Sequence, residues 1–249
     1  MVDHSELIVD VDNPATWPDQ LAELVDTMTD HVREVEGESP DLACSDLDVA
    51  SFEGEIEDVL DGQLLRAYHA TRLLPHEVEA IRSTGLQILN DDLVCQRLTD
   101  AYLQGFLTEA ERDQLVAGRT VTQGRRDKVC LFLSQNELVN SPHGFARLLE
   151  TWGGEGIYWA HADKGDALRP KLLSLGTPSI VVALLDLAAP RQKTLIFPGL
   201  AHAFTSARLG LPDVGGSISY FAPITADKVE DIFQPGHIDY PSSAGIPQE

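Results

Sequence analysis

Three separate parts of the sequence contain residues of types that can act on a small bound molecule, and these residues are His69, the close pair Glu155 and Tyr158, and Ser219. A histidine can hydrogen-bond a hydroxyl group, a tyrosine offers a flat face for a ring, and a carboxylate can stabilise a developing positive charge. Each also has an ordinary structural interpretation. His69 could be a satisfied polar residue at a strand end, Tyr158 a core residue and Glu155 a surface charge.

Motifs of several other enzyme classes are absent from the sequence. No GxGxxG, Walker loop, GxSxG or HExxH pattern occurs, which weakens dehydrogenase, P-loop, serine-hydrolase and zincin hypotheses. The eight histidines do not cluster at metal-ligand spacing. His161 with Asp163 could bind a metal, but such a pair is more typical of two solvent-facing side chains. We therefore expect no metal.

The charge of the chain is concentrated near its start. Residues 1–62 hold nineteen of the 40 acidic side chains and a single basic one, Arg33. The rest of the chain holds 21 acidic and 17 basic residues and is nearly balanced. A polyanion is repelled by nucleic acid, so residues 1–62 should either keep the protein soluble or cover a basic surface. The loop 118–127 carries Arg119, Arg125 and Arg126, which could contact a substrate or this acidic segment.

Cysteine usage and the first residues suggest a compartment. The three cysteines are widely spaced and form no CxxC, which disfavours a disulfide framework or a zinc knuckle. No signal peptide is visible, and no apolar run reaches the roughly 20 residues of a membrane helix. We expect a cytoplasmic protein that does not enter the membrane.

Hydrophobic periodicity and capping residues predict helices along the whole chain. Pro75 suits a helix start, Gly85 a helix end, and Thr108 with Glu111 forms a capping-box pattern. Helices are expected over residues 17–36, 50–60, 75–85, 91–117 (split near Gly105), 145–151 and 163–175 (broken at Pro170).

Short apolar and β-branched runs predict the strands. They are expected over residues 64–71, 128–134, 157–160, 179–187, 193–197 and 217–221. The run 179–187 is continuous and β-branched, as in a strand buried on both faces. Strands and helices are mixed without the regular alternation of a doubly wound sheet, which predicts an α+β fold.

Three motifs occur in the order shown by the ADP-ribosyltransferase superfamily, in its branch close to diphtheria toxin and the poly-ADP-ribose polymerases. They are Tyr68-His69-Ala70-Thr71 at a strand end, Gly156-Ile157-Tyr158-Trp159-Ala160 before a helix, and the strand 181–188. The chain resembles this superfamily over roughly residues 64–233. The resemblance implies a split-sheet domain with inserted helices over residues 63–240, between an acidic helical segment 1–62 and a flexible tail 241–249.

The resemblance also implies roles for single residues. His69 would hydrogen-bond a ribose hydroxyl of NAD, and Tyr158 would stack on the nicotinamide ring. The backbone of Ala70, which replaces a glycine of the family, would hold the nicotinamide amide. Arg72 would meet the diphosphate or form a surface salt bridge. The remaining residues implied for the NAD pocket are Tyr68, Thr71, Gly156 and Trp159.

The sequence departs from the family at the catalytic acid. Ser219 is the best match for the family's glutamate and Ser217 the second, and neither carries a negative charge. Asp166 stands where the family often has a serine that binds the nicotinamide amide. Glu155 or Asp166 could serve as a displaced acid, or both could be surface charges.

Several hypotheses about function remain open at this point. The first is an NAD-dependent mono-ADP-ribosyltransferase of toxin or effector type that modifies a macromolecular target, restrained by an antitoxin or by its own acidic segment. The second is an inactive module of the same fold that binds NAD or ADP-ribose. A third is an RNA 2′-phosphotransferase, which needs several basic residues around a 2′-phosphate. A fourth is an interaction protein that acts through residues 1–62.

Overall fold

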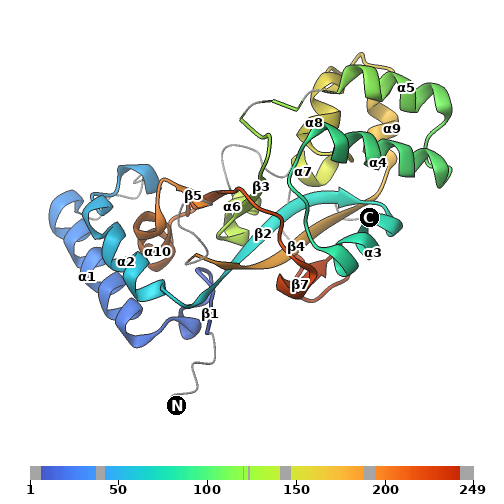
Figure 1. Ribbon diagram of the computed structural model, residues 1–249. Coiled ribbons are helices and arrows are strands. Elements are labelled where there is room, and N and C mark those ends of the chain that lie inside the picture. The colour runs from blue at the N-terminus through green and yellow to red at the C-terminus, as the bar shows by residue number, and fades with distance from the viewer. Residues whose placement is uncertain are drawn as a thin grey trace. The chain divides into compact units, whose positions relative to one another are not determined.

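The computed structural model describes residues 7–37, 43–119, 121–122, 124–140, 147–187 and 194–241. The fold is α+β, as predicted from the mixed order of helices and strands (Figure 1). Seven strands form one sheet in the order β5-β6-β3-β2-β4-β7, with β1 beside β2. The strands are β1 (Ile8–Val9), β2 (Leu64–Leu73), β3 (Val129–Phe132), β4 (Thr177–Asp186), β5 (Thr194–Phe197), β6 (Ser217–Tyr220) and β7 (Val229–Phe233).

The chain forms two compact units, each assembled from three segments. Unit 1 comprises Met1–Tyr68, Cys130–Gly144 and Ala183–Tyr220. Unit 2 comprises His69–Val129, Phe145–Val182 and Phe221–Glu249. The segment up to residue 62, expected as an appendage, lies in unit 1 together with β5, β6 and most of β3.

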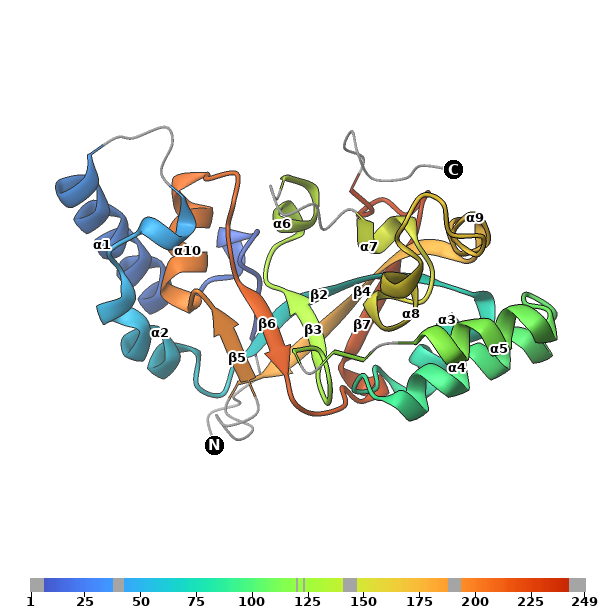
Figure 2. The same ribbon diagram turned by 90° about the horizontal axis from the view of Figure 1, so that it is seen from above.

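Unit 1 has its helices α1 (Asp19–Glu36), α2 (Glu53–Leu60) and α10 (Leu200–Leu209) in one group, which both ribbon views show (Figure 2). A fourth helix, α6 (Gln135–Asn140), follows β3. The apolar residues of α1 recur every three or four positions, so Leu21, Val25 and Met28 are fully buried on one side of that helix. The ring of Trp17 meets that of Phe204 edge to face at 5.3 Å. Residues near the chain start are therefore core residues of this unit.

Unit 2 has a separate core, which forms around the fully buried ring of Trp152. Its helices are α3 (Pro75–Thr84), α4 (Asp91–Leu103), α5 (Glu109–Gly118), α7 (Arg147–Glu150), α8 (Glu155–Tyr158) and α9 (Arg169–Ser174). Short 3₁₀ turns complete the two units, at Pro14–Thr16, Cys44–Asp46, Ala50–Phe52, Trp159–His161 and Ala226–Lys228. The predicted capping box is confirmed, because Thr108 Oγ1 accepts from the Glu111 amide and Glu111 accepts from the Thr108 amide.

Three local predictions are wrong. Residues 157–160 are helical rather than a strand, since α8 ends at Tyr158 and a 3₁₀ turn follows. A short apolar run cannot distinguish a buried strand from a buried helical turn, and here Gly156, Ile157 and Tyr158 are all buried instead of alternating. The helix expected over 163–175 begins only at Arg169, with Pro170 in its first turn, where proline is tolerated.

The third correction concerns His69, which lies inside β2 and not at its end. The strand runs on to Leu73, three residues beyond Ala70. Several predictions fall outside the described residues, namely those for residues 1–6 and 188–193 and for the tail 242–249. Among the described residues no helix is both long and apolar enough to cross a membrane.

Candidate functional site

The motif around His69 is divided between the two faces of β2. Successive side chains of a strand point to opposite faces, so Tyr68 and His69 cannot line the same side of the sheet. The Tyr68 ring is buried, and its hydroxyl donates a hydrogen bond to Asp10 at 3.0 Å. His69 is half-buried, while Ala70 and Thr71 are buried in the strand.

Arg72, the implied diphosphate ligand, is engaged with the backbone of unit 2. Its guanidinium donates to the carbonyl oxygens of Leu149 at 3.2 Å, Leu175 at 2.8 Å and Gly176 at 2.5 Å. The side chain is buried. A buried guanidinium needs such acceptors, so these three contacts explain its position without a phosphate.

A buried network positions the turn that precedes α8. Glu77 accepts from Arg97 Nε at 2.6 Å and from the Trp152 indole nitrogen at 2.8 Å. Burial by itself would raise the pKa of Glu77, but the Arg97 charge and the hydrogen bonds outweigh it and lower the pKa. Arg97 also donates to the Gly153 carbonyl at 3.4 Å. The turn at Gly153-Gly154 is thereby tied to α3 and α4.

Immediately after that turn, unit 2 brings an acid, two arginines and two aromatic rings together. Arg125 Nε lies 2.7 Å from a Glu155 carboxylate oxygen, and Arg147 lies 3.7 Å from the other. Glu155 is mostly covered, with 19% of its side chain exposed, whereas the arginines are exposed by 42% and 47%. We call Arg125, Arg147, Glu155, Tyr158 and Trp159 the Glu155 cluster.

The two aromatic residues of the Glu155 cluster have opposite environments. Tyr158 is 6% exposed and belongs to the hydrophobic core of unit 2, so its ring faces are covered. Trp159 is 51% exposed, and the Arg147 guanidinium lies 5.4 Å from the centre of its ring. A ligand ring could therefore stack on Trp159 but not on Tyr158.

The Tyr158 hydroxyl is buried and has no hydrogen-bond partner among the described residues. Burial raises the pKa of this hydroxyl to about 12, and the Glu155 carboxylate adds to the rise while Arg147 and Arg125 oppose it. The group is therefore a protonated donor at neutral pH. An unsatisfied buried donor costs about 1–3 kcal/mol, a loss that a ligand acceptor at this position would remove.

Asp166, the other candidate acid, lies in a turn before α9. It accepts from the Leu168 amide at 2.8 Å and contacts His161 Nδ1 at 3.1 Å. The Leu168 hydrogen bond, followed by that with His161, lowers the pKa of Asp166. Both contacts cap and fix the local turn, so Asp166 has a structural role in unit 2.

Ser219, the match for the family's glutamate, lies on β6 of unit 1, which corresponds to the strand predicted over residues 217–221. It pairs with Leu195 in the antiparallel ladder of β5 and β6. Its neighbour Ser217 pairs with Phe197 in the same ladder. Both serines therefore belong to a different unit from Glu155 and Tyr158.

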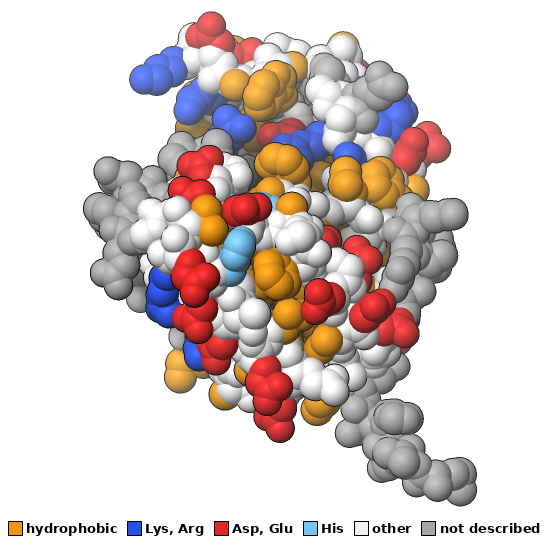
Figure 3. Space-filling view, turned by 90° about the vertical axis from the view of Figure 1, so that its left-hand side faces the viewer, with side chains coloured by type: hydrophobic (Ala, Val, Ile, Leu, Met, Phe, Trp, Pro, Cys, Tyr) orange, Lys and Arg blue, Asp and Glu red, His pale blue; other side chains and the backbone are white. Residues whose placement is uncertain are grey.

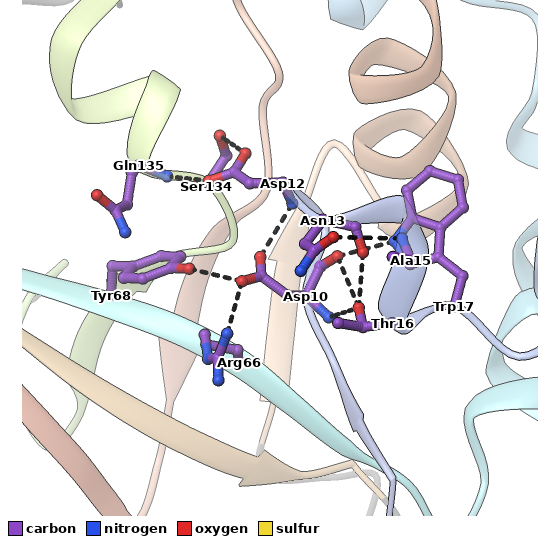
Figure 4. Close-up of polar contacts among 10 residues, drawn as sticks. All are labelled: Asp10, Asp12, Asn13, Ala15, Thr16, Trp17, Arg66, Tyr68, Ser134 and Gln135. Carbon is purple, nitrogen blue, oxygen red and sulfur yellow. Dashed lines mark hydrogen bonds and ion pairs between the residues drawn. The ribbon is translucent and has the colours of Figure 1, made fainter. Parts of the chain in front are cut away.

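Unit 1 contains a second polar cluster, which the sequence analysis missed (Figure 4). Asp10 follows β1, and its carboxylate accepts from Arg66 at 2.9 Å and Tyr68 at 3.0 Å. Its other oxygen accepts from the Asp12 amide at 2.9 Å. Asp12 in turn accepts from the Ser134 hydroxyl and from the Gln135 amide at the start of α6. We call these six residues the Asp10 cluster.

Burial raises the pKa of two residues of this cluster, the Tyr68 hydroxyl and the Asp12 carboxyl, and the shift of Asp12 bears on acid pH. Burial raises the pKa of Asp12 more than the hydrogen bonds from Ser134 and Gln135 lower it, and the Asp10 charge adds to the rise. Each carboxylate in the cluster is satisfied by groups of the chain itself. The arrangement therefore joins β1, β2 and the start of α6.

One sequence signal could have revealed residues that were missed. The alternation Val9-Asp10-Val11-Asp12 places two acids on one side of an extended segment, which is unusual beside a strand. No such signal exists for Arg147. The distance between Arg147 and Glu155 depends on the irregular turns between them and not on a regular helix or strand spacing. Arg119 and Arg126 of the basic loop both contact Asp91, at 3.8 and 2.7 Å, and only Arg125 reaches Glu155.

Comparisons with protein-family models, with curated proteins and with solved structures found no match for this chain. Within the residues that the structure describes, no group of three or more His, Cys, Asp or Glu side chains is placed to hold a metal ion. Inferences about function therefore depend on the residue geometry and on the motifs.

Proposed function

We propose that this chain is an NAD-dependent mono-ADP-ribosyltransferase that acts on a macromolecular target and uses Glu155 as its acid. The observation that carries the proposal is the Glu155 cluster, where a covered carboxylate lies beside an exposed tryptophan, two arginines and an unsatisfied tyrosine hydroxyl. These are the groups that a dinucleotide with a ring, a diphosphate and a cleavable glycosidic bond requires.

The charge of the cluster favours an anionic ligand. Glu155 contributes one negative charge and the two arginines two positive ones, so these three groups have a net charge of +1. Arginine binds phosphate oxygens well because its planar fork presents paired donors. Arg125 and Arg147, each more than 40% exposed, can hold a diphosphate while one side of each still faces Glu155.

The proposed reaction assigns a task to each group. The bond between the nicotinamide nitrogen and the ribose carbon breaks, its electron pair leaves with neutral nicotinamide, and positive charge develops on the ribose. The Glu155 carboxylate stabilises that charge. The target's nucleophile then forms the new bond to the ribose carbon, and its proton passes to Glu155 or to solvent. Trp159 fixes a ring by stacking, and the Tyr158 hydroxyl donates to an oxygen of the ligand.

This proposal changes the roles implied by the sequence. The buried Tyr158 contributes its hydroxyl and not its ring face, and Trp159 takes the stacking role. Glu155 replaces Ser219 as the catalytic candidate. His69 remains a proposed ribose ligand, on the face of β2 opposite Tyr68.

A second candidate is a binding module for NAD or ADP-ribose without turnover. The ion pairs that hold Glu155 favour it, because a carboxylate neutralised by Arg125 and Arg147 stabilises a developing cation less well. An RNA 2′-phosphotransferase gains no support from Arg72, whose guanidinium donates to three backbone carbonyls.

The deciding experiment incubates the full chain with NAD and follows free nicotinamide, with and without a cell extract as a source of targets. We expect release, and a loss of about 100-fold in rate for Glu155→Gln, the effect typical of removing one electrostatic stabiliser. The matched control is Glu79→Gln, an exposed acid of unit 2 that pairs with Arg82 at 3.3 Å. It should keep the full rate.

Thermal unfolding with and without NAD, compared with the nicotinamide release, separates the two candidates. NAD that raises the melting temperature without releasing nicotinamide supports the binding module, since a ligand stabilises whatever it binds by mass action. Neither release nor stabilisation would refute both candidates.

A further inference from the structure

His161 is one of the buried polar residues of unit 2. Charged side chains elsewhere are solvated: the acidic ones of α1 are all exposed, and Figure 3 shows the side of the molecule with α1 and α2, where acidic side chains are spread among hydrophobic ones. The His161 side chain, by contrast, is 6% exposed. Burying a polar group costs free energy unless its hydrogen bonds are made, so the contacts of His161 indicate what it holds together.

One edge of the His161 ring is fixed by Asp166. Nδ1 lies 3.1 Å from a carboxylate oxygen of Asp166, in the turn before α9. The hydrogen bond from the Leu168 amide, followed by that with His161, lowers the pKa of Asp166, so the carboxylate is ionised at neutral pH and accepts the Nδ1 proton. Nε2 is then the acceptor of a neutral ring, and it is buried without a hydrogen-bond partner among the described residues.

The other edge of the ring faces the end of α5. A side-chain carbon at Gly118, the last residue of that helix, would lie 3.0 Å from Nε2 and 3.3 Å from Cε1 of His161. Both distances are shorter than the 3.4–4 Å of an ordinary van der Waals contact. The φ of Gly118 is not in the left-handed region, so the space that the His161 ring occupies is what requires a glycine here.

His161 ends the short 3₁₀ turn that begins at Trp159. The turn is weakly fixed by its own backbone, because the Ala162 amide donates to the Trp159 carbonyl at 3.4 Å, a long hydrogen bond. The Trp159 ring on this turn is 51% exposed. The contacts of His161 with Asp166 and Gly118 therefore hold the backbone that presents the Trp159 ring to solvent.

We propose that His161 is a positioning residue of the Glu155 cluster, which acts through Trp159 and does not touch the ligand. The inference rests on the proposed function, in which the Trp159 ring stacks on a ring of NAD. A side chain that is already held in place loses less freedom when the ligand binds. The stack is the same before and during bond cleavage, so displacing Trp159 should raise KM for NAD and leave kcat unchanged.

The first test displaces His161 from outside the site, in the full chain. Gly118→Ala places a methyl group 3.0 Å from Nε2 and pushes the ring and its turn aside. We expect KM for NAD in nicotinamide release to rise about fivefold, within the range for a partly lost aromatic stack. The matched control is Gly124→Ala, where the added carbon meets no atom within 4 Å, and it should leave KM unchanged. Loss of folded protein would instead lower kcat at constant KM.

A double-mutant cycle tests whether the effect passes through His161 and Trp159. His161→Asn keeps an amide donor for Asp166 but lacks the outer ring atoms, so it should also raise KM. Gly118→Ala should add nothing in that background, because the methyl group then has room. His161→Asn should likewise add nothing in a Trp159→Ala background, since the ring through which His161 acts is gone.

Acrylamide quenching of tryptophan fluorescence tests the positioning without NAD. Trp17 and Trp152 are 7% and 0% exposed, so quenching reports mainly on Trp159. Gly118→Ala should raise the quenching constant, because a loosened turn exposes the ring further, and Gly124→Ala should not.

The outcomes separate this inference from the proposed function. If the parent cleaves NAD, an unchanged KM in Gly118→Ala and His161→Asn would overturn the inference, as would an undiminished rise in KM in the Trp159→Ala background. A parent that neither binds nor cleaves NAD would refute the proposed function instead. Quenching would then decide the role of His161, and a constant that stays the same in Gly118→Ala would overturn it.

Discussion

The Asp10 cluster of unit 1 and the Glu155 cluster of unit 2 each contain a carboxylate, an arginine and a tyrosine, yet they differ in what the tyrosine contacts. In unit 1, Tyr68 donates to the carboxylate that also binds Arg66. In unit 2, the arginines hold the carboxylate, but the hydroxyl of Tyr158 has no partner among the described residues.

This difference separates a structural cluster from a candidate site. Buried polar groups are nearly always satisfied, so a cluster with all its hydrogen bonds made needs no ligand to explain it. The Glu155 cluster has an unsatisfied donor, exposed arginines and an exposed ring at one place. Variants should therefore affect stability in the Asp10 cluster and ligand binding in the Glu155 cluster.

The largest expected effect is on stability, from Asp10→Asn. It removes the negative charge that pairs with Arg66 and accepts from Tyr68, in a site where the Asp10 side chain is 7% exposed. Breaking a buried ion pair from one side costs about 3 kcal/mol or more. Urea denaturation followed by circular dichroism should show this loss.

Asp30→Asn is the control for that measurement. Asp30 also pairs with an arginine, Arg33 at 3.1 Å, but its side chain is 73% exposed. Exposed pairs contribute about 0–1 kcal/mol, so the variant should unfold almost as the parent does. A similar loss in both variants would contradict the structural role of the Asp10 cluster.

The next effect is on binding, from Trp159→Ala. Removing the exposed ring should raise the Kd for NAD about tenfold, which corresponds to about 1.4 kcal/mol. Isothermal titration calorimetry can measure it, with Leu103→Ala as a control, since Leu103 is a 70% exposed apolar residue on α4. An unchanged Kd would remove Trp159 from the proposed site.

Tyr158→Phe should change stability and binding in opposite directions. The hydroxyl has no partner among the described residues, so its removal should stabilise the free protein by about 1 kcal/mol. The same change should weaken NAD binding, because the ligand loses a donor. Thermal unfolding with and without NAD tests both, and Tyr68→Phe should instead destabilise, since Tyr68 donates to Asp10.

The sequence predicted elements better than it predicted the site. Long patterns with clear ends, such as the helix from Pro75 to Gly85 and the strand 179–187, appear as α3 and β4. Local chemistry determines these elements, through the fixed φ of proline and the β-branched run. Residues 157–160 failed because four apolar residues fit a buried helical turn as well as a strand.

The site depended on contacts that no local pattern encodes. Glu155 meets Arg125 and Arg147 only because turns of irregular length return the chain to the same place. Likewise, the apolar periodicity predicts the helix over 17–36, but it does not show that Val25 and Met28 are core residues of unit 1. Deleting this segment would expose that core, so the deletion cannot serve as a clean test of partner binding.

The smallest effect concerns the pH dependence of stability, and it tests the Asp10 cluster again. The pKa of Asp12 is raised in the folded chain above its ordinary value, chiefly by burial. The folded state therefore holds this proton more tightly than the unfolded state. The resulting stability is present below the ordinary pKa of about 3.8 and is lost as pH rises through the folded value.

Asp12→Asn removes this titration and keeps an oxygen that accepts from the Gln135 amide. Relative to the parent, the variant should become more stable as pH rises from below 4 to 7. Urea denaturation of both proteins across this range measures the difference at each pH. If the difference in stability between the two proteins stayed constant with pH, Asp12 would not be held in the buried contact with Ser134 and Gln135. The Asp10 cluster would then be as open to solvent as the arginines around Glu155.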